Sequence, residues 1–560
     1  MSVRSAIPIR NVKVRPTLKG RTPDPKALAE VEALLGNEPR RRDCLIEHLH
    51  RIQDRYAHVS AAHLVALAAA MRMAPAEVYE VATFYHHFDV VKEGDAAPPA
   101  ITVRVCDSLA CAMAGAQLLL TELPGILGRD VRVIPAPCVG RCETAPVVVV
   151  GQNARAHATA DAVKELVAAK AVRQDPGMYI GYAEYRNTGG YRILPQCLAG
   201  ERDPRSVTQA MEDSGLRGMG GAGFPAGRKW RIVRAEPEPR LMAVNIDEGE
   251  PGTFKDRHYL ERDPHRFLEG MLVAAWAAGI AEVYVYLRDE YAGCRAILET
   301  ELAALRADPP CVLPPIHLRR GAGAYICGEE SAMIESIEGK RGMPRLRPPY
   351  VAQVGLFGRP TLEHNMETLY WVREILERGP AWFAGHGRRD RKGLRSFSVS
   401  GRVKKPGVHL APAGITVNEL IEECCGGMQD GHAFYAYLPG GASGGILPAS
   451  MGDIPLDFDT LQPYGCFIGS AAIIVLSDRD RATDAARNLM QFFAEESCGQ
   501  CTPCRVGTAK TLKLIEAPQW NQALLKELSQ VMIDASICGL GQAAPNPIRC
   551  VIKYFPEEVA

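Results

Sequence analysis

The first regular pattern along the chain is helical and lies between residues 43 and 88. Apolar side chains recur there every three or four residues, in three successive groups: Leu45, Leu49, Ile52 and Tyr56; Leu64, Leu67 and Met71; Val78, Val81 and Tyr85. Ser60 is suited to cap one of these helices, and Pro75 to begin another. The pattern predicts a helical bundle over residues 38–92, preceded by a basic N-terminal tail over residues 1–37.

Short strands then alternate with a helix. Three segments have the composition of strands and one that of a helix: residues 101–105, 131–134 and 147–150, and residues 118–123. This alternation predicts a small α/β domain over residues 100–172. Turn residues punctuate the next stretch, at Asp175-Pro176-Gly177 and Gly189-Gly190, so we expect residues 173–204 to be a linker.

The second half of the chain predicts three further domains. A larger α/β domain spans residues 205–390, and its apolar run 270–287 predicts a buried helix and a core strand, because Gly279 and Glu282 interrupt it. Residues 394–480 alternate like short strands around a helix with the capping box Thr416 and Glu419, which suits a β-grasp domain. Helical spacing returns over residues 481–560.

Composition narrows the class of protein without naming a partner. A chain of 560 residues exceeds one hydrophobic core, and 65 basic against 65 acidic residues leave no field that would attract nucleic acid or a membrane. No apolar stretch follows the basic residues of segment 1–26, so we expect no secretory signal and a cytoplasmic location. In such a reducing compartment the 17 cysteines are better explained by metal ligation than by disulfides.

Four cysteines of the small α/β domain have ligand spacing. Cys106 and Cys111 follow the first strand, and Cys138 and Cys142 follow the next strand-like segment. Four thiolates suit either a [2Fe-2S] cluster or structural zinc, and the spacing alone leaves both open.

A second group near the C-terminus is more specific. Cys498, Cys501 and Cys504 form a C-x2-C-x2-C run, and Cys538 lies farther along the chain. Such a run can hold three corners of a cuboidal cluster while the distant cysteine holds the fourth. His86 and His87 show no ligand spacing with a third group, and we interpret them as surface or packing residues.

A glycine-rich segment predicts a site for a flavin. Gly218, Gly220, Gly221 and Gly223 satisfy G-x-G-x-x-G, but the residues before them look helical, so the strand of a standard dinucleotide fold is missing. So many glycines suit a backbone that lies against a phosphate and a planar ring. Acidic residues beside glycines recur in segments 245–256 and 321–330, where carboxylates could hold ribityl and ribose hydroxyls.

At these residues the chain resembles two subunits from the NADH end of respiratory complex I. Residues 38–172 resemble the small [2Fe-2S] subunit, and residues 205–555 its neighbour, which binds FMN, NADH and a [4Fe-4S] cluster. Fusion of the two resembles diaphorase subunits, and Gly440–Ser450 with the run around Cys498 most resembles the β subunit of NAD-dependent molybdenum or tungsten formate dehydrogenase. The fold class implied is multi-domain α/β: a helical bundle, a thioredoxin-like [2Fe-2S] domain, a Rossmann-like FMN/NAD domain, a β-grasp domain and a C-terminal helical [4Fe-4S] bundle.

The resemblance also implies a role for individual residues. It assigns the first quartet to [2Fe-2S] and the second to [4Fe-4S]. It implies FMN contacts by Gly218, Gly220, Gly221, Gly223, Lys229, Asn245, Asp247, Glu248, Gly328, Glu329, His364 and Asn365. It implies NAD contacts by Phe224, Glu250, Tyr325, Glu330, Arg347 and Tyr350. His364 stands where an Asn-Asn pair is usual, Ile232 replaces an aromatic residue, and Arg347 and Tyr350 replace Lys and Phe.

The resemblance implies hydride transfer between NAD and FMN with no catalytic side chain, and electron transfer through the clusters. The partner expected is a molybdenum or tungsten formate dehydrogenase α subunit with further iron–sulfur clusters, working reversibly, so that CO2 reduction is included. The alternatives are the diaphorase subunit of an NAD-reducing [NiFe] hydrogenase, a fused complex I component, and a zinc-bound scaffold without catalysis. Glu250 would favour NAD over NADP if its charge lies near the ribose.

Overall fold

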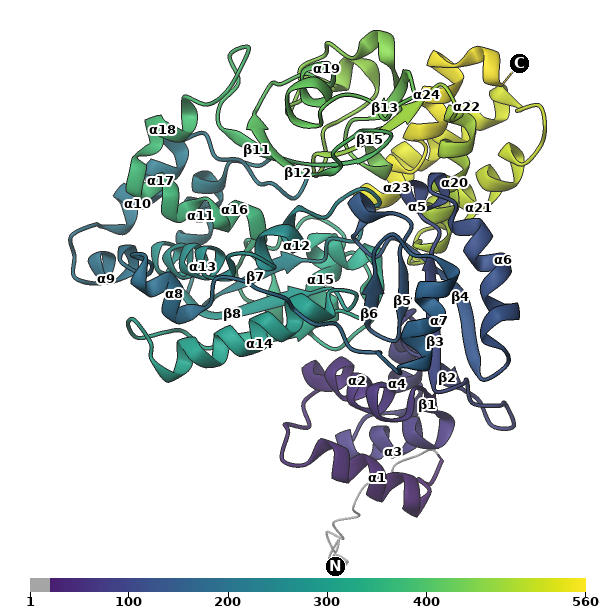
Figure 1. The fold of residues 1–560 in the computed structure, drawn as a ribbon. Helices are drawn as coiled ribbons and strands as arrows, with labels where there is room; N and C mark the ends of the chain where they lie inside the picture. Colours follow the sequence, from purple (N-terminus) through teal and green to yellow (C-terminus); the bar gives the residue numbers. More distant parts are fainter. Residues whose placement is uncertain (1–20, 560) are drawn as a thin grey trace, which may run out of the picture.

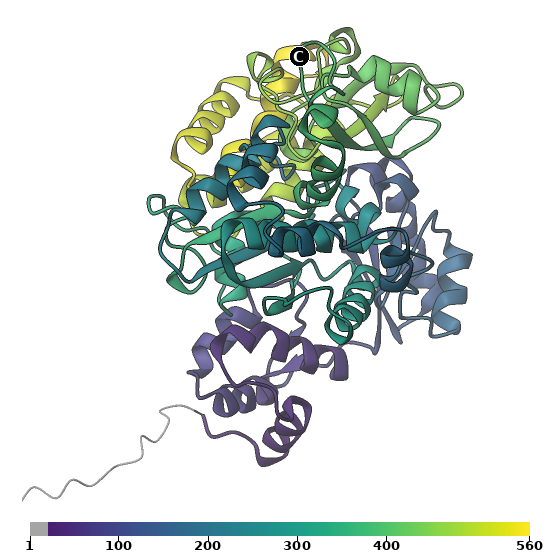
Figure 2. The ribbon, with the colours of Figure 1, turned by 90° about the vertical axis from the view of Figure 1, so that its left-hand side faces the viewer.

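A computed structural model describes residues 21–559. These residues form several domains that pack against one another (Figure 1). The N-terminal helical domain lies at the opposite end of the molecule from the β-grasp domain and the C-terminal helices, with the large α/β domain between them (Figures 1 and 2). No helix among the described residues is long and apolar enough to cross a membrane.

The helical domain contains α1 (Pro25–Leu35), α2 (Leu45–Tyr56), α3 (Ala61–Met71) and α4 (Pro75–Ala82). The Ser60 side chain accepts a hydrogen bond from the backbone N–H of His63, and Pro75 is the first residue of α4, as predicted. Two short parallel strands, β1 (Val59–Ser60) and β2 (Val90–Val91), complete it. Helix α1 lies within the predicted tail and buries Ala27, Val31 and Leu35, so the helical domain begins earlier than expected; residues 1–20 of the tail are outside the described residues.

The thioredoxin-like domain has a four-stranded sheet in the order β4-β3-β5-β6. Its strands are β3 (Ile101–Cys106), β4 (Val131–Ala136), β5 (Val148–Val150) and β6 (Asn153–Arg155), and only β3 and β4 are parallel. Its helices are α5 (Leu109–Met113), α6 (Ala116–Leu127) and α7 (Ala160–Ala168). Because β3 and β4 run parallel, the loops that carry the first cysteine quartet leave the sheet at one edge.

The segment predicted to be a linker is folded. It contains α8 (Tyr182–Asn187) and α9 (Ile193–Leu198), and it buries Tyr182, Tyr185 and Tyr191 in the core of the large α/β domain. The Tyr185 hydroxyl donates to the buried Glu269 carboxylate at 2.8 Å. Gly189 and Gly190 form a turn as predicted, whereas residues 175–177 have no assigned turn, and the aromatic side chains between the two places make the segment part of the domain.

The large α/β domain has a parallel sheet in the order β10-β7-β8-β9. Its strands are β7 (Arg240–Ile246), β8 (Ile280–Leu287), β9 (Ile316–Arg320) and β10 (Thr361–Asn365). Its helices are α10 (Pro204–Asp213), α11 (Ala226–Arg234), α12 (Lys255–Leu260), α13 (Pro264–Ala278), α14 (Ala292–Ala307), α15 (Glu330–Ile337), α16 (Met366–Tyr370), α17 (Val372–Arg378) and α18 (Pro380–Ala384). The apolar run 270–287 is the buried helix α13 followed by the core strand β8, as predicted.

The β-grasp domain has a mixed sheet in the order β12-β11-β15-β13-β14. Its strands are β11 (Leu394–Gly401), β12 (Gly407–Pro412), β13 (Phe434–Leu438), β14 (Leu447–Pro448) and β15 (Ala472–Ser477). The predicted capping box begins α19 (Val417–Glu419), which continues as a wider turn through Cys424. The C-terminal bundle consists of α20 (Ala482–Glu495), α21 (Thr502–Ile515), α22 (Gln522–Ala535), α23 (Gly539–Ala543) and α24 (Asn546–Tyr554).

Candidate cofactor sites

The structure gathers the first cysteine quartet in one buried place. Cys106 ends β3, Cys111 lies in α5, and Cys138 and Cys142 lie in the loop after β4. The Sγ atoms of Cys138 and Cys142 are 3.3 Å apart, and the neighbouring thiols of Cys111 and Cys138, together with burial, raise the pKa of Cys106 well above its usual range. Four buried thiols in one cluster fit a metal centre. Burial disfavours a charged thiolate, but a bound metal ion stabilises thiolates and so displaces the thiol protons.

The second quartet also converges, at the start of two helices. Cys501 immediately precedes α21, Cys504 lies in its first turn, and Cys538 immediately precedes α23. Burial raises the pKa of Cys504 to about 12 and that of Cys538 to about 11, and the thiols of Cys498 and Cys501 add to the effect on Cys504. Unpaired backbone N–H groups at the start of α21 stabilise negative charge, so the site suits an anionic cluster.

The glycine-rich loop joins α10 to α11 and lies at the carboxyl end of the parallel sheet. Gly221 has a φ of +117°, which side chains with a Cβ rarely adopt. A Cβ on Gly220 would lie 3.1 Å from the Cβ of Asn365, the last residue of β10. The loop therefore leaves a bare backbone surface beside the ends of β7 and β10, where open parallel sheets bind ligands.

The acidic and amide side chains expected to contact the flavin lie at the carboxyl end of the parallel sheet, beside the glycine loop. We call this place the flavin edge. The Asn245 amide donates to the carbonyl of Gly328 at 2.9 Å and accepts from the backbone N–H of Asp247. One carboxylate oxygen of Asp247, Oδ2, is buried with no hydrogen-bond partner, and burial raises the pKa of this residue well above its usual range. Burial of a carboxylate oxygen without a hydrogen-bond partner costs free energy. Asp247 is therefore suited to accept a hydrogen bond from the hydroxyl of a bound ligand.

Sequence reasoning missed a second acid at this place. Glu363, in β10, also has a buried carboxylate oxygen without a partner, and Lys229 donates to its backbone carbonyl at 3.0 Å. Burial raises the pKa of Glu363 well above its usual range. Nothing in the sequence around Glu363 distinguished it from an ordinary strand residue, because its position follows from the pairing of β10 with β7.

Two residues assigned to FMN make hydrogen bonds to other parts of the protein, and their contact with FMN stays a prediction. The Glu248 carboxylate accepts from the N–H groups of Asp256 and Arg257, at the start of α12, and from the Tyr291 hydroxyl at 2.9 Å. His364 is buried, and its Nε2 accepts from the Trp230 indole at 2.7 Å. These hydrogen bonds use the Glu248 carboxylate and the Nε2 atom of His364.

The neutral ring of His364 predicts a loss of stability in acid. Burial and the nearby Lys229 charge lower its pKa well below 6.5, so protonation favours the unfolded chain and stability is lost as pH falls below 6.5. The loss should be up to about 1.4 kcal/mol per pH unit. His364→Asn keeps a hydrogen-bond acceptor and should reduce the difference between denaturant midpoints at pH 7.5 and 5.5. The exposed His157→Asn is the control, and equal acid sensitivity of H364N and wild type would contradict the assignment.

The residues assigned to NAD differ in their exposure to solvent. Phe224 and Tyr350 are 38% and 55% exposed, and the Arg228 guanidinium lies 5.6 Å from the Phe224 ring centre. Arg347 pairs with Glu329 and with Glu330 at 2.9 Å. Tyr325 packs beside the backbone of Gly249. Phe224 directly follows the last glycine of the loop, and contact of these side chains with a nucleotide stays a prediction.

We expected the Glu250 carboxylate to be available to a ribose, but in the structure it is bound by other residues. Its carboxylate is held by the backbone N–H of Ser443 at 2.9 Å and by the Ser470 hydroxyl at 3.2 Å, both from the β-grasp domain. This contact between distant segments could not be read from the local acidic motif. The inference that Glu250 selects NAD over NADP therefore lacks support from this geometry.

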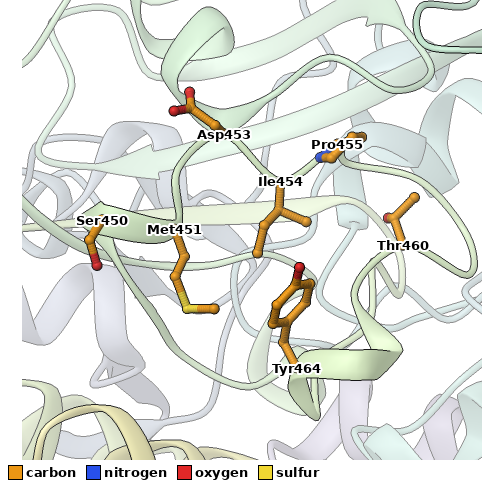
Figure 3. Close-up of a pocket in the computed structure, with 7 residues that line it drawn as sticks. All are labelled: Ser450, Met451, Asp453, Ile454, Pro455, Thr460 and Tyr464. Carbon is orange, nitrogen blue, oxygen red and sulfur yellow. The ribbon is translucent and has the colours of Figure 1, made fainter.

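Two other features lie outside the predicted sites. A hollow of about 480 Å3 in the β-grasp domain is lined by Ser450, Met451, Asp453, Ile454, Pro455, Thr460 and Tyr464 (Figure 3). His50, His87 and Asp289 form a cluster in which His87 Nδ1 lies 2.7 Å from Asp289, whose other oxygen pairs with Arg320. Because a cation already neutralises Asp289, we interpret this cluster as an ion-pair contact between domains, in line with the packing role expected of His87.

Comparison with known proteins supports each part of this arrangement. Four family models match: the thioredoxin-like [2Fe-2S] ferredoxin over residues 31–171, the Nuo51 FMN-binding domain over 211–374, the SLBB domain over 396–447, and the NADH-ubiquinone oxidoreductase-F iron-sulfur binding region over 484–560. The predicted fold class and the cofactors FMN, NAD, [2Fe-2S] and [4Fe-4S] are confirmed, and the zinc alternative for the first quartet falls away.

Relatives that cover most of the chain give the same result. The NADH-quinone oxidoreductase of Rhizobium meliloti has an F 2 subunit that is 42% identical over 67% of this chain and 92% of its own length. The alpha subunit of the NAD-reducing hydrogenase HoxS of Cupriavidus necator is 33% identical over 92% of this chain and 91% of its own. The crystal structure of an NAD+-reducing [NiFe]-hydrogenase in the H2-reduced state contains a chain with a TM-score of 0.82, 31% identity and 93% coverage of both chains. The chain therefore belongs to the family of NADH-binding FMN subunits with [2Fe-2S] and [4Fe-4S] domains that includes these proteins.

Proposed function

We propose that this chain is the diaphorase subunit of an NAD-linked oxidoreductase complex, with the ligand sets assigned above. The observation that carries the proposal is the match to the HoxS alpha subunit over 92% of this chain, which includes the fusion of the two complex I-like parts. Both cysteine quartets and the flavin edge fall within that common architecture.

The chain's own residues would bind and orient the reactants. The glycine loop leaves room for a flat ring, Asp247 and Glu363 can accept hydrogen bonds from ligand hydroxyls, and Phe224 and Tyr350 can stack on the nucleotide. FMN, when bound, exchanges a hydride with the nicotinamide and single electrons with the clusters. The buried first quartet lies in a part of the chain that excludes water, which favours electron transfer over side reactions.

As the electron-donating partner we propose, in first place, a protein of the hydrogenase type. The HoxS alpha subunit and a chain of the NAD+-reducing [NiFe]-hydrogenase cover the fused architecture, whereas the NADH-quinone oxidoreductase subunit of Rhizobium meliloti covers part of it. A molybdenum or tungsten formate dehydrogenase α subunit, expected from Gly440–Ser450, gains no support from these relatives and stays a prediction. The cytoplasmic location also stays a prediction.

Purification of the tagged full chain from its native host tests the partner directly. We expect a nickel–iron subunit to co-purify and the complex to reduce a viologen dye with NADH. Nickel in the complex, measured by elemental analysis, would support the hydrogenase-type partner. Molybdenum or tungsten with NAD+-dependent formate oxidation would overturn that choice in favour of the formate dehydrogenase.

A further inference from the structure

The loop that carries Cys138 and Cys142 is held by the large α/β domain. Arg288, just after β8, donates through Nη2 to the backbone carbonyl of Cys138 at 2.7 Å. Arg257, in α12, donates through Nε to the carbonyl of Gly140 at 2.8 Å. The Tyr291 ring fills the space where a side chain at position 140 would lie, so the two domains are in close contact there.

Both guanidinium groups are buried and both have acidic partners. Arg257 pairs with Glu143, from the cysteine loop itself, and with Glu261 at 2.6 Å. Arg288 pairs with Glu290 at 3.0 Å and also donates to the backbone carbonyl of Glu248, in the acidic segment beside the flavin edge. Arg288 therefore connects the segment beside the flavin edge to the cysteine loop through one side chain.

The charge of a buried guanidinium group interacts strongly with a nearby cluster, because little water is present to screen it. Reduction of an iron–sulfur cluster adds one negative charge, and hydrogen bonds and charges near its ligands set its potential. The acidic partners offset part of each arginine's charge. Removal of an arginine would also leave a carboxylate unpaired near the cluster, so both effects disfavour the reduced cluster.

We propose that Arg288 and Arg257 are positioning residues of the [2Fe-2S] centre, which raise its reduction potential and fix its ligand loop against the flavin domain. The inference rests on the proposed assignment of Cys106, Cys111, Cys138 and Cys142 to this cluster. The cluster gains or loses a single electron in the step concerned, and no proton transfer or further reactant is required. The arginines themselves do not react.

The test is a redox titration of the purified full chain, followed by electron paramagnetic resonance. Arg288→Gln should disfavour reduction of the [2Fe-2S] cluster about tenfold or more, a fall of about 59 mV for one electron, while the [4Fe-4S] potential stays unchanged. Arg288→Lys, which keeps the charge, should shift the potential less. Arg295→Gln is the matched control, because Arg295 joins the same domains through Gln152 at 3.0 Å but does not contact the cysteine loop.

Three results would overturn the inference. The first is an unchanged [2Fe-2S] potential in R288Q with full iron content, and the second is an equal shift in R288K and R288Q. The third is loss of the cluster from both R288Q and Arg257→Gln, which would show a role in assembly alone. Absence of a [2Fe-2S] signal from the wild-type chain would instead refute the ligand assignment, so failure of the two claims can be told apart.

Discussion

Replacement of Cys538 by alanine is expected to stop electron transfer to a partner while NADH oxidation with ferricyanide continues. We predict that this residue provides the distant corner of the [4Fe-4S] ligand set. It immediately precedes α23, and the Cys498 thiol adds to the rise in its pKa that burial causes. With one thiolate missing, the cuboidal cluster loses one of its four protein ligands. We expect partner-directed turnover to fall by about 100-fold or more, since even indirect disturbance of a metal site costs 10- to 100-fold.

Ferricyanide takes electrons from the flavin directly, so that activity should stay within about twofold of wild type. Cys550→Ala is the matched control, because Cys550 is also buried, lies 12 residues farther along and contacts Cys466 rather than the quartet. Iron content and the [4Fe-4S] resonance should be lost in C538A and kept in C550A. A normal [4Fe-4S] resonance in C538A would show that the ligand set is wrong.

A branched residue at Gly221 is expected to remove the flavin. With φ at +117°, valine would be strained at this position, and its side chain would press towards the backbone of Gly469, which lies 3.5 Å from the ideal Cβ. Strain of about 1 to 3 kcal/mol weakens FMN binding by about 5- to 150-fold if the loop relaxes to relieve it. Purified G221V should therefore contain little FMN and show a matching loss of NADH oxidation.

Gly358→Val separates this effect from general strain. Gly358 belongs to the same domain and has a φ of +72°, but it is exposed and its ideal Cβ meets no atom within 4 Å. We expect G358V to keep its FMN even if it is somewhat less stable. Equal FMN content in G221V and wild type, measured by released flavin fluorescence, would exclude the glycine loop from the flavin site.

Much of the fold follows from local sequence patterns. Helical spacing located α2 to α4, strand-like composition located β3, β4 and β5 but not β6, and the interruptions at Gly279 and Glu282 separated α13 from β8. These features depend on residues close together in the chain, where periodicity is informative. The linker was misjudged because its buried tyrosines find partners, such as Glu269, that lie far away in sequence.

The candidate sites show the same contrast between features set by nearby residues and features set by distant ones. Cysteine spacing and glycine density marked both quartets and the flavin loop, since cofactor chemistry restricts residue types at fixed intervals. The roles of acidic residues were harder to predict. Glu248 caps α12, Glu250 is held by Ser443, and Glu363 joins the flavin edge only through strand pairing. A carboxylate's function depends on which distant groups surround it, and a single sequence does not show this.

The most direct test of the account is anaerobic addition of NADH to the purified full chain. Analysis of the same sample should find one FMN and about six iron atoms with as much labile sulfide, as one [2Fe-2S] and one [4Fe-4S] cluster require. NADH should bleach the flavin absorbance and, within the same chain, produce a cluster resonance. A flavin that NADH fails to bleach in a chain with its full iron content would contradict the proposed relay.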